Sequence, residues 1–122
     1  AQVGLTEDSA KQAGRDFRVL RWAFHENDRA QAEGVTDGLV KAIVAPNGHI
    51  LGCGIVGSHA GELIQPWVLA MNEKLKIGAM ATMIVPYPTL GEVSKRAAIS
   101  FYTPSLFSHR TRSIVRFLSK FG

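Results

Sequence analysis

The sequence predicts a single α+β domain, and three observations point to that fold class. The chain has 122 residues, which suits one domain with one hydrophobic core. A β-hairpin is signalled near its middle, and apolar side chains recur at helical spacing in its second half. Apolar residues make up 46% of the chain and charged residues 20%, which is typical of globular proteins. The sequence therefore predicts one domain over residues 1–122.

The first quarter of the chain predicts a short helix followed by a strand. Thr6 can cap a helix, and Gly14 is suited to end it. Residues 17–24 then carry apolar side chains on both faces of an extended run, which predicts a strand covered on both sides. Residues 27–30 are interpreted as a turn or as a continuation of this strand.

The clearest local signal is a β-hairpin. Residues 39–45 and 50–56 are rich in β-formers, and Asn47-Gly48 between them can take the positive φ of a tight turn. Residues 52–57 also have the form G-x-G-x-x-G. That nucleotide-binding fingerprint requires a strand before the glycines and a helix that opens at the last one, whereas these glycines lie within a strand. Close backbone approach is therefore the favoured interpretation.

The second half of the chain predicts helices. Residues 62–75 carry apolar side chains at helical spacing, and Pro66 falls in the first turn, where proline is tolerated. Residues 77–84 are apolar, and their secondary structure remains ambiguous.

A rigid loop leads into the next helix. Two prolines, Pro86 and Pro88, bracket Tyr87 and restrict the backbone on both sides of it. Thr89 and Glu92 then form a Thr-x-x-Glu capping box, which predicts that Thr89 caps a helix running towards residue 101.

Residues 105–121 predict a final amphipathic helix with Arg112, Arg116 and Lys120 along one side. The formal net charge is +4, and most of the surplus lies towards this end of the chain. A solvated charged face is the simpler interpretation. The alternative function is a binding module that docks this helix on a membrane surface or on nucleic acid. We expect no nucleic-acid partner and at most a weak membrane-surface contact.

The cysteine and histidine content excludes several kinds of site. Cys53, the only cysteine, cannot form an internal disulfide and is interpreted as an inert core residue. A lone thiol favours a reducing, cytoplasmic location. The four histidines are scattered without metal-ligand spacing, so we expect no metal site. The longest apolar stretches fall short of the roughly 20 residues that a membrane helix requires.

Several motifs occur in a specific order. G-L-V-K at residues 38–41, I-L-G-C-G-I-V-G at 50–57 and A-G-E-L-I at 60–64 are followed by Y-P-T-L-G-E at 87–92. In this order and spacing they resemble the C-terminal dimerisation domain of the FAD-dependent pyridine-nucleotide disulfide oxidoreductases, which include dihydrolipoamide dehydrogenase, glutathione reductase and mercuric reductase. The resemblance spans nearly all of the chain.

The resemblance implies an antiparallel sheet with helices packed on it, and a two-fold homodimer. It also implies that FAD- and NAD(P)-binding domains and a redox cysteine pair belong to an N-terminal part that is absent from this chain. The full-length enzyme would then use FAD and NAD(P)H. This fragment alone is expected to bind no cofactor and to be inactive.

The resemblance also implies a site at the dimer interface. In the family, a histidine just before the Pro-Thr, paired with the glutamate that follows, reaches the partner's flavin and redox disulfide. Tyr87 occupies the histidine position and Glu92 matches the glutamate. We expect Tyr87 and Glu92 to complete the partner subunit's active site, and Tyr87 and Pro88 to contact its FAD.

Tyrosine at the histidine position changes the chemistry that is expected. A phenol, with a pKa of about 10, is a poor base at neutral pH, but it can donate a hydrogen bond or pack on a flavin edge. The chain also ends in Lys120-Phe121-Gly122, without the vicinal cysteine pair usual in mercuric reductases. The resemblance therefore leaves the oxidised substrate unassigned.

Overall fold

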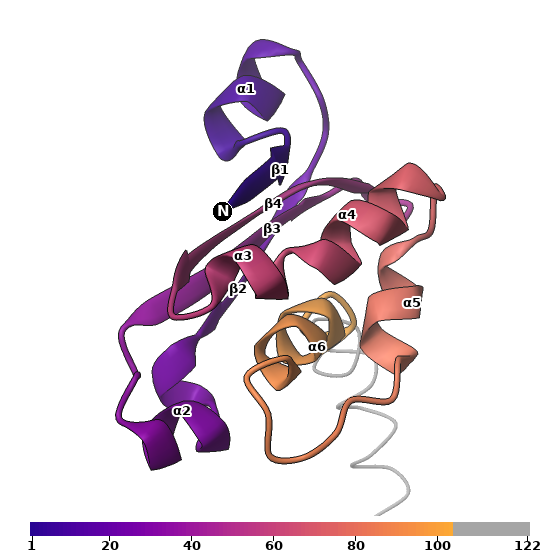
Figure 1. The fold of residues 1–122 in the computed structure, drawn as a ribbon. Helices are drawn as coiled ribbons and strands as arrows, with labels where there is room; N and C mark the ends of the chain where they lie inside the picture. The colour runs from indigo at the N-terminus through magenta and orange to yellow at the C-terminus, as the bar shows by residue number, and fades with distance from the viewer. Residues whose placement is uncertain (104–122) are drawn as a thin grey trace, which may run out of the picture.

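The computed structural model describes residues 1–103 and consists of one antiparallel sheet with helices on both of its faces (Figure 1). The sheet has four strands in the order β1-β4-β3-β2, and every neighbouring pair is antiparallel. Their bounds are Gln2–Gly4 for β1, Arg18–Ala23 for β2, Gly38–Val44 for β3 and Ile50–Gly57 for β4. The predicted antiparallel sheet and central hairpin are confirmed, whereas β1 was not predicted.

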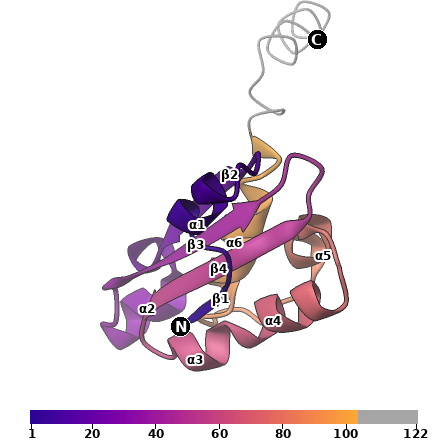
Figure 2. The same cartoon turned by 90° about the horizontal axis from the view of Figure 1, so that it is seen from above.

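The helices are short. Their bounds are Glu7–Gln12 for α1, Asp28–Glu33 for α2, Ala60–Leu63 for α3, Gln65–Asn72 for α4, Ile77–Thr82 for α5 and Glu92–Ile99 for α6, with a 3₁₀ turn η1 at Phe24–Glu26. Helices α4 and α6 pack against the sheet and α5 packs against α6, whereas α1 lies over the opposite face (Figures 1 and 2).

The hydrophobic core lies between the sheet and helices α4 to α6. Val40, Ala42 and Val44 alternate along β3 and are fully buried, as expected for one face of a strand. Trp67 of α4 is also fully buried, and its indole Nε1 donates to the Ser94 hydroxyl of α6 at 2.9 Å. This bond satisfies a buried donor and joins two helices across the core.

The glycines of β4 permit close backbone approach, as predicted. A Cβ at Gly52 would lie 1.9 Å from the carbonyl oxygen of Leu5, and one at Gly57 would lie 2.7 Å from the Phe24 ring. Cys53 between them is fully buried, and burial raises the pKa of its thiol to about 12. An uncharged, inaccessible thiol is unreactive, which agrees with its interpretation as a core residue.

The prediction of one continuous helix over residues 62–75 is wrong. The structure has two helices there, α3 and α4, which are separated at Ile64. Pro66 stands in the first turn of α4 and cannot donate a backbone hydrogen bond to the carbonyl of residue 62, so a single helix cannot run through it unbroken.

Two other stretches form helices that the sequence did not clearly predict. Residues 27–30 form neither a turn nor a strand, but the start of α2, which Asn27 caps by accepting from the Ala30 amide at 2.8 Å. The ambiguous residues 77–84 contain the helix α5.

The two predicted helix caps have different outcomes. Thr6 caps α1, because its hydroxyl accepts from the Ser9 amide at 3.1 Å. Thr89 does not cap α6, which begins at Glu92 after Gly91. The Thr89 hydroxyl instead donates to the Pro86 carbonyl at 2.6 Å and closes the loop before the helix, and the Thr89 carbonyl accepts from the Glu92 amide at 3.4 Å.

Within residues 1–103, no helix combines the length and the apolar character needed to cross a membrane. The predicted helix over 105–121, with Arg112, Arg116 and Lys120, lies outside the described residues. Its docking on a membrane surface or nucleic acid stays a prediction.

Candidate functional site

Tyr87 and Glu92 line one concavity of about 210 Å³, although they belong to different elements. The first lies on the loop before α6 and the second begins α6 itself. The rest of the lining comes from β2, η1, α2 and the second turn of α6: Trp22, Glu26, Asn27, Asp28 and Arg96. The sequence motif therefore corresponds to a real cluster.

Tyr87 is held on a short, internally bonded loop. The bond between Thr89 and the Pro86 carbonyl closes this loop, and the flanking prolines restrict its backbone. The Tyr87 ring is 67% exposed. An aromatic side chain that is presented to solvent on a constrained loop is available for contact with another molecule.

The hydroxyl of Tyr87 donates to Asp28 Oδ2 at 2.5 Å. This hydrogen bond and the negative charge of Asp28 raise the pKa of Tyr87 above its ordinary value, and partial desolvation and the charge of Glu92 act in the same direction. The phenol is therefore neutral throughout the physiological pH range.

Glu92 shares the concavity without being the acceptor of the Tyr87 proton. Its carboxylate accepts from Arg96 Nη2 at 3.4 Å, one helical turn further along α6. Pro88, the other predicted contact residue, offers its carbonyl to Arg29 Nη1 at 3.5 Å.

Asp28 and Asn27 are site residues that the sequence analysis missed. The signal was present, because Asn27 precedes Asp28 and a run of good helix formers, the usual pattern at a helix N-terminus. The short length of α2 and its position next to a predicted strand concealed that pattern.

The concavity provides a neutral phenol, carboxylates and one guanidinium. Within residues 1–103, its lining contains no cysteine or histidine, and hence no thiolate nucleophile or imidazole base. By itself, this arrangement can accept and donate hydrogen bonds.

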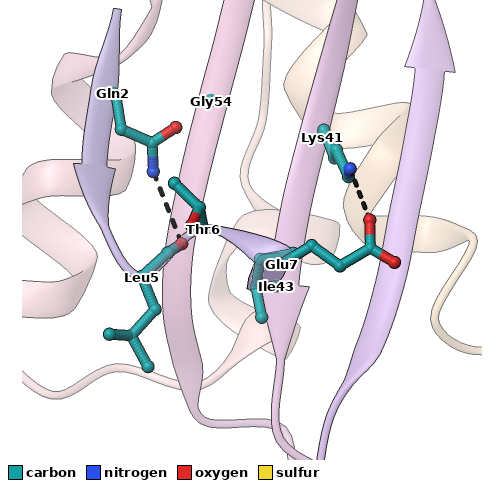
Figure 3. A pocket seen from close by; sticks show the side chains of 7 residues that line it. All are labelled: Gln2, Leu5, Thr6, Glu7, Lys41, Ile43 and Gly54. Carbon is teal, nitrogen blue, oxygen red and sulfur yellow. Dashed lines mark hydrogen bonds and ion pairs between the residues drawn. The ribbon is translucent and has the colours of Figure 1, made fainter. Parts of the chain in front are cut away.

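A second concavity, of about 200 Å³, lies on the opposite face of the sheet (Figure 3). There Glu7 reaches from α1 to Lys41 of β3 at 2.5 Å, and Arg21 of β2 is 3.6 Å from the same carboxylate. The hydrogen bond from Lys41 is the main reason that the pKa of Glu7 is lowered. The Glu7 carboxylate thus lies among cationic side chains of the sheet, which is consistent with a structural role in docking α1 on it.

Comparison with known proteins gives the same family along most of the chain. Residues 1–98 match the family described as pyridine nucleotide-disulphide oxidoreductase, dimerisation domain. The dihydrolipoyl dehydrogenase of Rhizobium etli is 43% identical over 103 residues, which are 84% of this chain and 21% of the relative. That of Zymomonas mobilis is 35% identical over 87% of this chain and 23% of the relative. The chain thus spans about a fifth of the length of these relatives.

A solved structure agrees with this match. The HOCl-induced flavoprotein disulfide reductase RclA of Escherichia coli, in a Cu(II) complex, superposes with a TM-score of 0.78 at 25% identity, over 81% of this chain and 23% of that one. The α+β architecture, the motifs around Tyr87 and Glu92, and these matches lead to one conclusion: the chain belongs to the dimerisation-domain family of the pyridine nucleotide-disulphide oxidoreductases.

Proposed function

We propose that this chain is the homodimerisation domain of a FAD-dependent NAD(P)H oxidoreductase whose FAD- and NAD(P)-binding domains belong to an N-terminal part absent from this chain. Membership of the dimerisation-domain family supports the proposal. So does the span of about a fifth of relatives that are named as dihydrolipoyl dehydrogenases. The cytoplasm remains the proposed location.

Exposed apolar side chains on the loop before α6 support a contact between two copies. Ile84 is 94% exposed and Tyr87 is 67% exposed on this loop. Large apolar side chains presented together to solvent are typical of surfaces that another protein covers. A second copy that covers this loop would place Tyr87 and Glu92 at the subunit boundary.

Tyr87 and Glu92 are proposed to complete the partner subunit's active site, with Tyr87 and Pro88 against the edge of its FAD. An exposed ring on a constrained loop suits contact with a planar heteroaromatic edge. The flavin, when bound, supplies the electron-transfer chemistry. The part of this chain is to shape the site and to place one neutral phenol in it.

The dimer is tested by light scattering on a sizing column. We expect the chain to run as a dimer and Ile84→Arg to run as a monomer, because a buried guanidinium without a partner is strongly disfavoured. The matched control is Val56→Arg on β4, where the side chain is 74% exposed in a different part of the fold. A wild-type monomer over a wide concentration range would contradict self-association through this chain.

The active-site role is tested in a flavoprotein that carries this chain. Tyr87→Phe should lower turnover by about tenfold, since that factor corresponds to about 1.4 kcal/mol, the size of one hydrogen bond. Tyr102→Phe is the control, because it makes the same chemical change at another exposed tyrosine. Unchanged turnover of Tyr87→Phe with every electron acceptor tried would exclude the role.

A further inference from the structure

The start of α2 contacts the loop before α6 at three consecutive residues on each side. The contacts are Tyr87 hydroxyl to Asp28 Oδ2 at 2.5 Å, Arg29 Nη1 to the Pro88 carbonyl at 3.5 Å, and Asn27 Nδ2 to the Thr89 carbonyl at 3.1 Å. The two segments are about sixty positions apart in the sequence, and Figure 1 shows the loop running beside α2. Tertiary folding alone brings them together.

We infer that Asn27 and Asp28 are positioning residues: Asn27 fixes the loop, and Asp28 directs the phenol of Tyr87. The importance of these contacts for catalysis rests on the proposed role of Tyr87. The contacts themselves are independent of that role, because they lie within one chain.

Asn27 has the environment expected of a residue that holds two elements together. It is 3% exposed, and both halves of its amide are used. Oδ1 accepts from the Ala30 amide at 2.8 Å and starts α2, while Nδ2 donates to the Thr89 carbonyl at 3.1 Å. Replacing it would leave a buried donor, a buried acceptor or both without a partner.

Asp28, and not Glu92, determines what Tyr87 can offer to another molecule. The single phenolic proton is donated to Asp28 within the chain, so the lone pairs of the oxygen remain to accept. Asp28 and Glu92 place negative charge near the phenol, and Arg96 in the same concavity offsets it only in part. Tyr87 is thereby suited to a hydrogen-bond donor of the partner subunit or its ligand, and unsuited to an anion.

The role of Asp28 is tested by titrating the phenol of Tyr87 in the chain, using absorbance of tyrosinate. Tyr87→Phe assigns the signal, because Tyr102 is the only other tyrosine. Asp28→Asn should lower the pKa of Tyr87 towards its ordinary value, and Glu92→Gln should lower it less, because Asp28 provides both the hydrogen bond and the nearer charge.

Glu26→Gln is the matched control for that titration. It removes the same charge from the same concavity, where Glu26 faces His25 at 3.8 Å and not the phenol. A shift in Glu92→Gln as large as that in Asp28→Asn, or no shift in Asp28→Asn, would overturn the assignment of Asp28.

The role of Asn27 is tested with Asn27→Asp, which separates its two contacts. A carboxylate still accepts from the Ala30 amide and caps α2, but it cannot donate to the Thr89 carbonyl. We expect protection of the Ala30 amide from hydrogen exchange to persist while the NMR signals of the Tyr87 ring shift. If Asn27→Asp does not fold, Asn27→Ser serves as the second variant, because serine also caps a helix and has no amide donor. Unchanged ring signals would contradict the positioning role.

The flavoprotein distinguishes this inference from the proposed function. Asp28→Asn should move the alkaline limb of the pH profile of kcat to lower pH, and Tyr87→Phe should abolish that limb. If Tyr87→Phe has no effect on turnover, the proposed active-site role of Tyr87 fails, while the phenol titration still decides whether Asp28 directs Tyr87.

Discussion

Individual residues determine how closely the segments of this fold approach one another. Gly52 lies beneath Leu5, where any side chain would meet the backbone at 1.9 Å. Asn27 uses both halves of a buried amide, and Tyr87 donates its only proton to Asp28. Each of these residues acts through atoms of a distant segment, so its importance is visible only once those segments are folded together.

Gly52→Ala should destabilise the chain by about 1–3 kcal/mol, because the Leu5 backbone cannot yield as a flexible side chain can. Gly61→Ala on α3 is the control. Its new methyl group would meet nothing within 4 Å, and alanine favours the helix by about 1 kcal/mol. Urea unfolding measures both variants. Equal stabilities would show that β4 and the segment around Leu5 are not in close contact.

At the scale of elements, short segments are stabilised by what they pack against. Six-residue helices such as α1 and α2 are too short to persist alone in water. Glu7 holds α1 on the sheet through Lys41 and Arg21, and Asn27 holds α2 against the loop before α6. Strand β1 depends in the same way on pairing with β4.

Val3→Pro tests the dependence of β1 on β4. Ala1 and Ile55 form a hydrogen-bonded pair, because each backbone donates to the other. Hydrogen-bonded pairs recur at every second residue of an antiparallel ladder, so the next such pair is Val3 with Cys53. Proline there removes one ladder bond and should cost about 1–3 kcal/mol in urea unfolding. Gln2→Pro is the control, because the amide of residue 2 points away from β4. Equal losses in the two variants would contradict this pairing.

Glu7→Gln tests the docking of α1. The folded-state pKa of Glu7 is lowered, so its stabilising effect is present above the unfolded-state value and is lost as the pH falls through the folded-state value. The wild type should therefore be more stable than Glu7→Gln near neutral pH, and the difference should shrink in acid. Added salt should reduce it as well, since the ion pairs are partly exposed. A difference that does not depend on pH would exclude the ion pairs as its cause.

At the scale of the whole molecule, one face of the sheet carries most of the core, and apolar side chains remain exposed beyond it. Val68 and Leu69 on α4 and Ile84 on the loop before α6 are all exposed. This distribution is consistent with a domain whose packing continues into a second copy.

The thermal midpoint of the wild type should accordingly rise with protein concentration, because association stabilises the folded state by mass action. That of Ile84→Arg should not depend on concentration. Calorimetry over a wide dilution series checks both, and Val56→Arg should behave as the wild type does. A wild-type midpoint that is independent of concentration would argue against a folded dimer.

Local pattern in the sequence was sufficient to predict the hairpin, the strand over residues 17–24, the Thr6 cap and the α+β class, because each depends on residues close together in the chain. The order of the motifs around residues 38–64 and 87–92 was sufficient to indicate the family. Pro66 carried the signal for the break between α3 and α4, but the periodicity on both sides of it favoured one helix.

Only the tertiary structure decided which groups meet. The capping box at Thr89 and Glu92 was a reasonable local pattern, yet the Thr89 hydroxyl bonds to Pro86 and its carbonyl to Asn27. Asp28 became the partner of Tyr87 because α2 folds against a loop 59 positions away. Sequence spacing governs contacts within a helical turn or a hairpin, whereas contacts between elements depend on how those elements bury their apolar faces together.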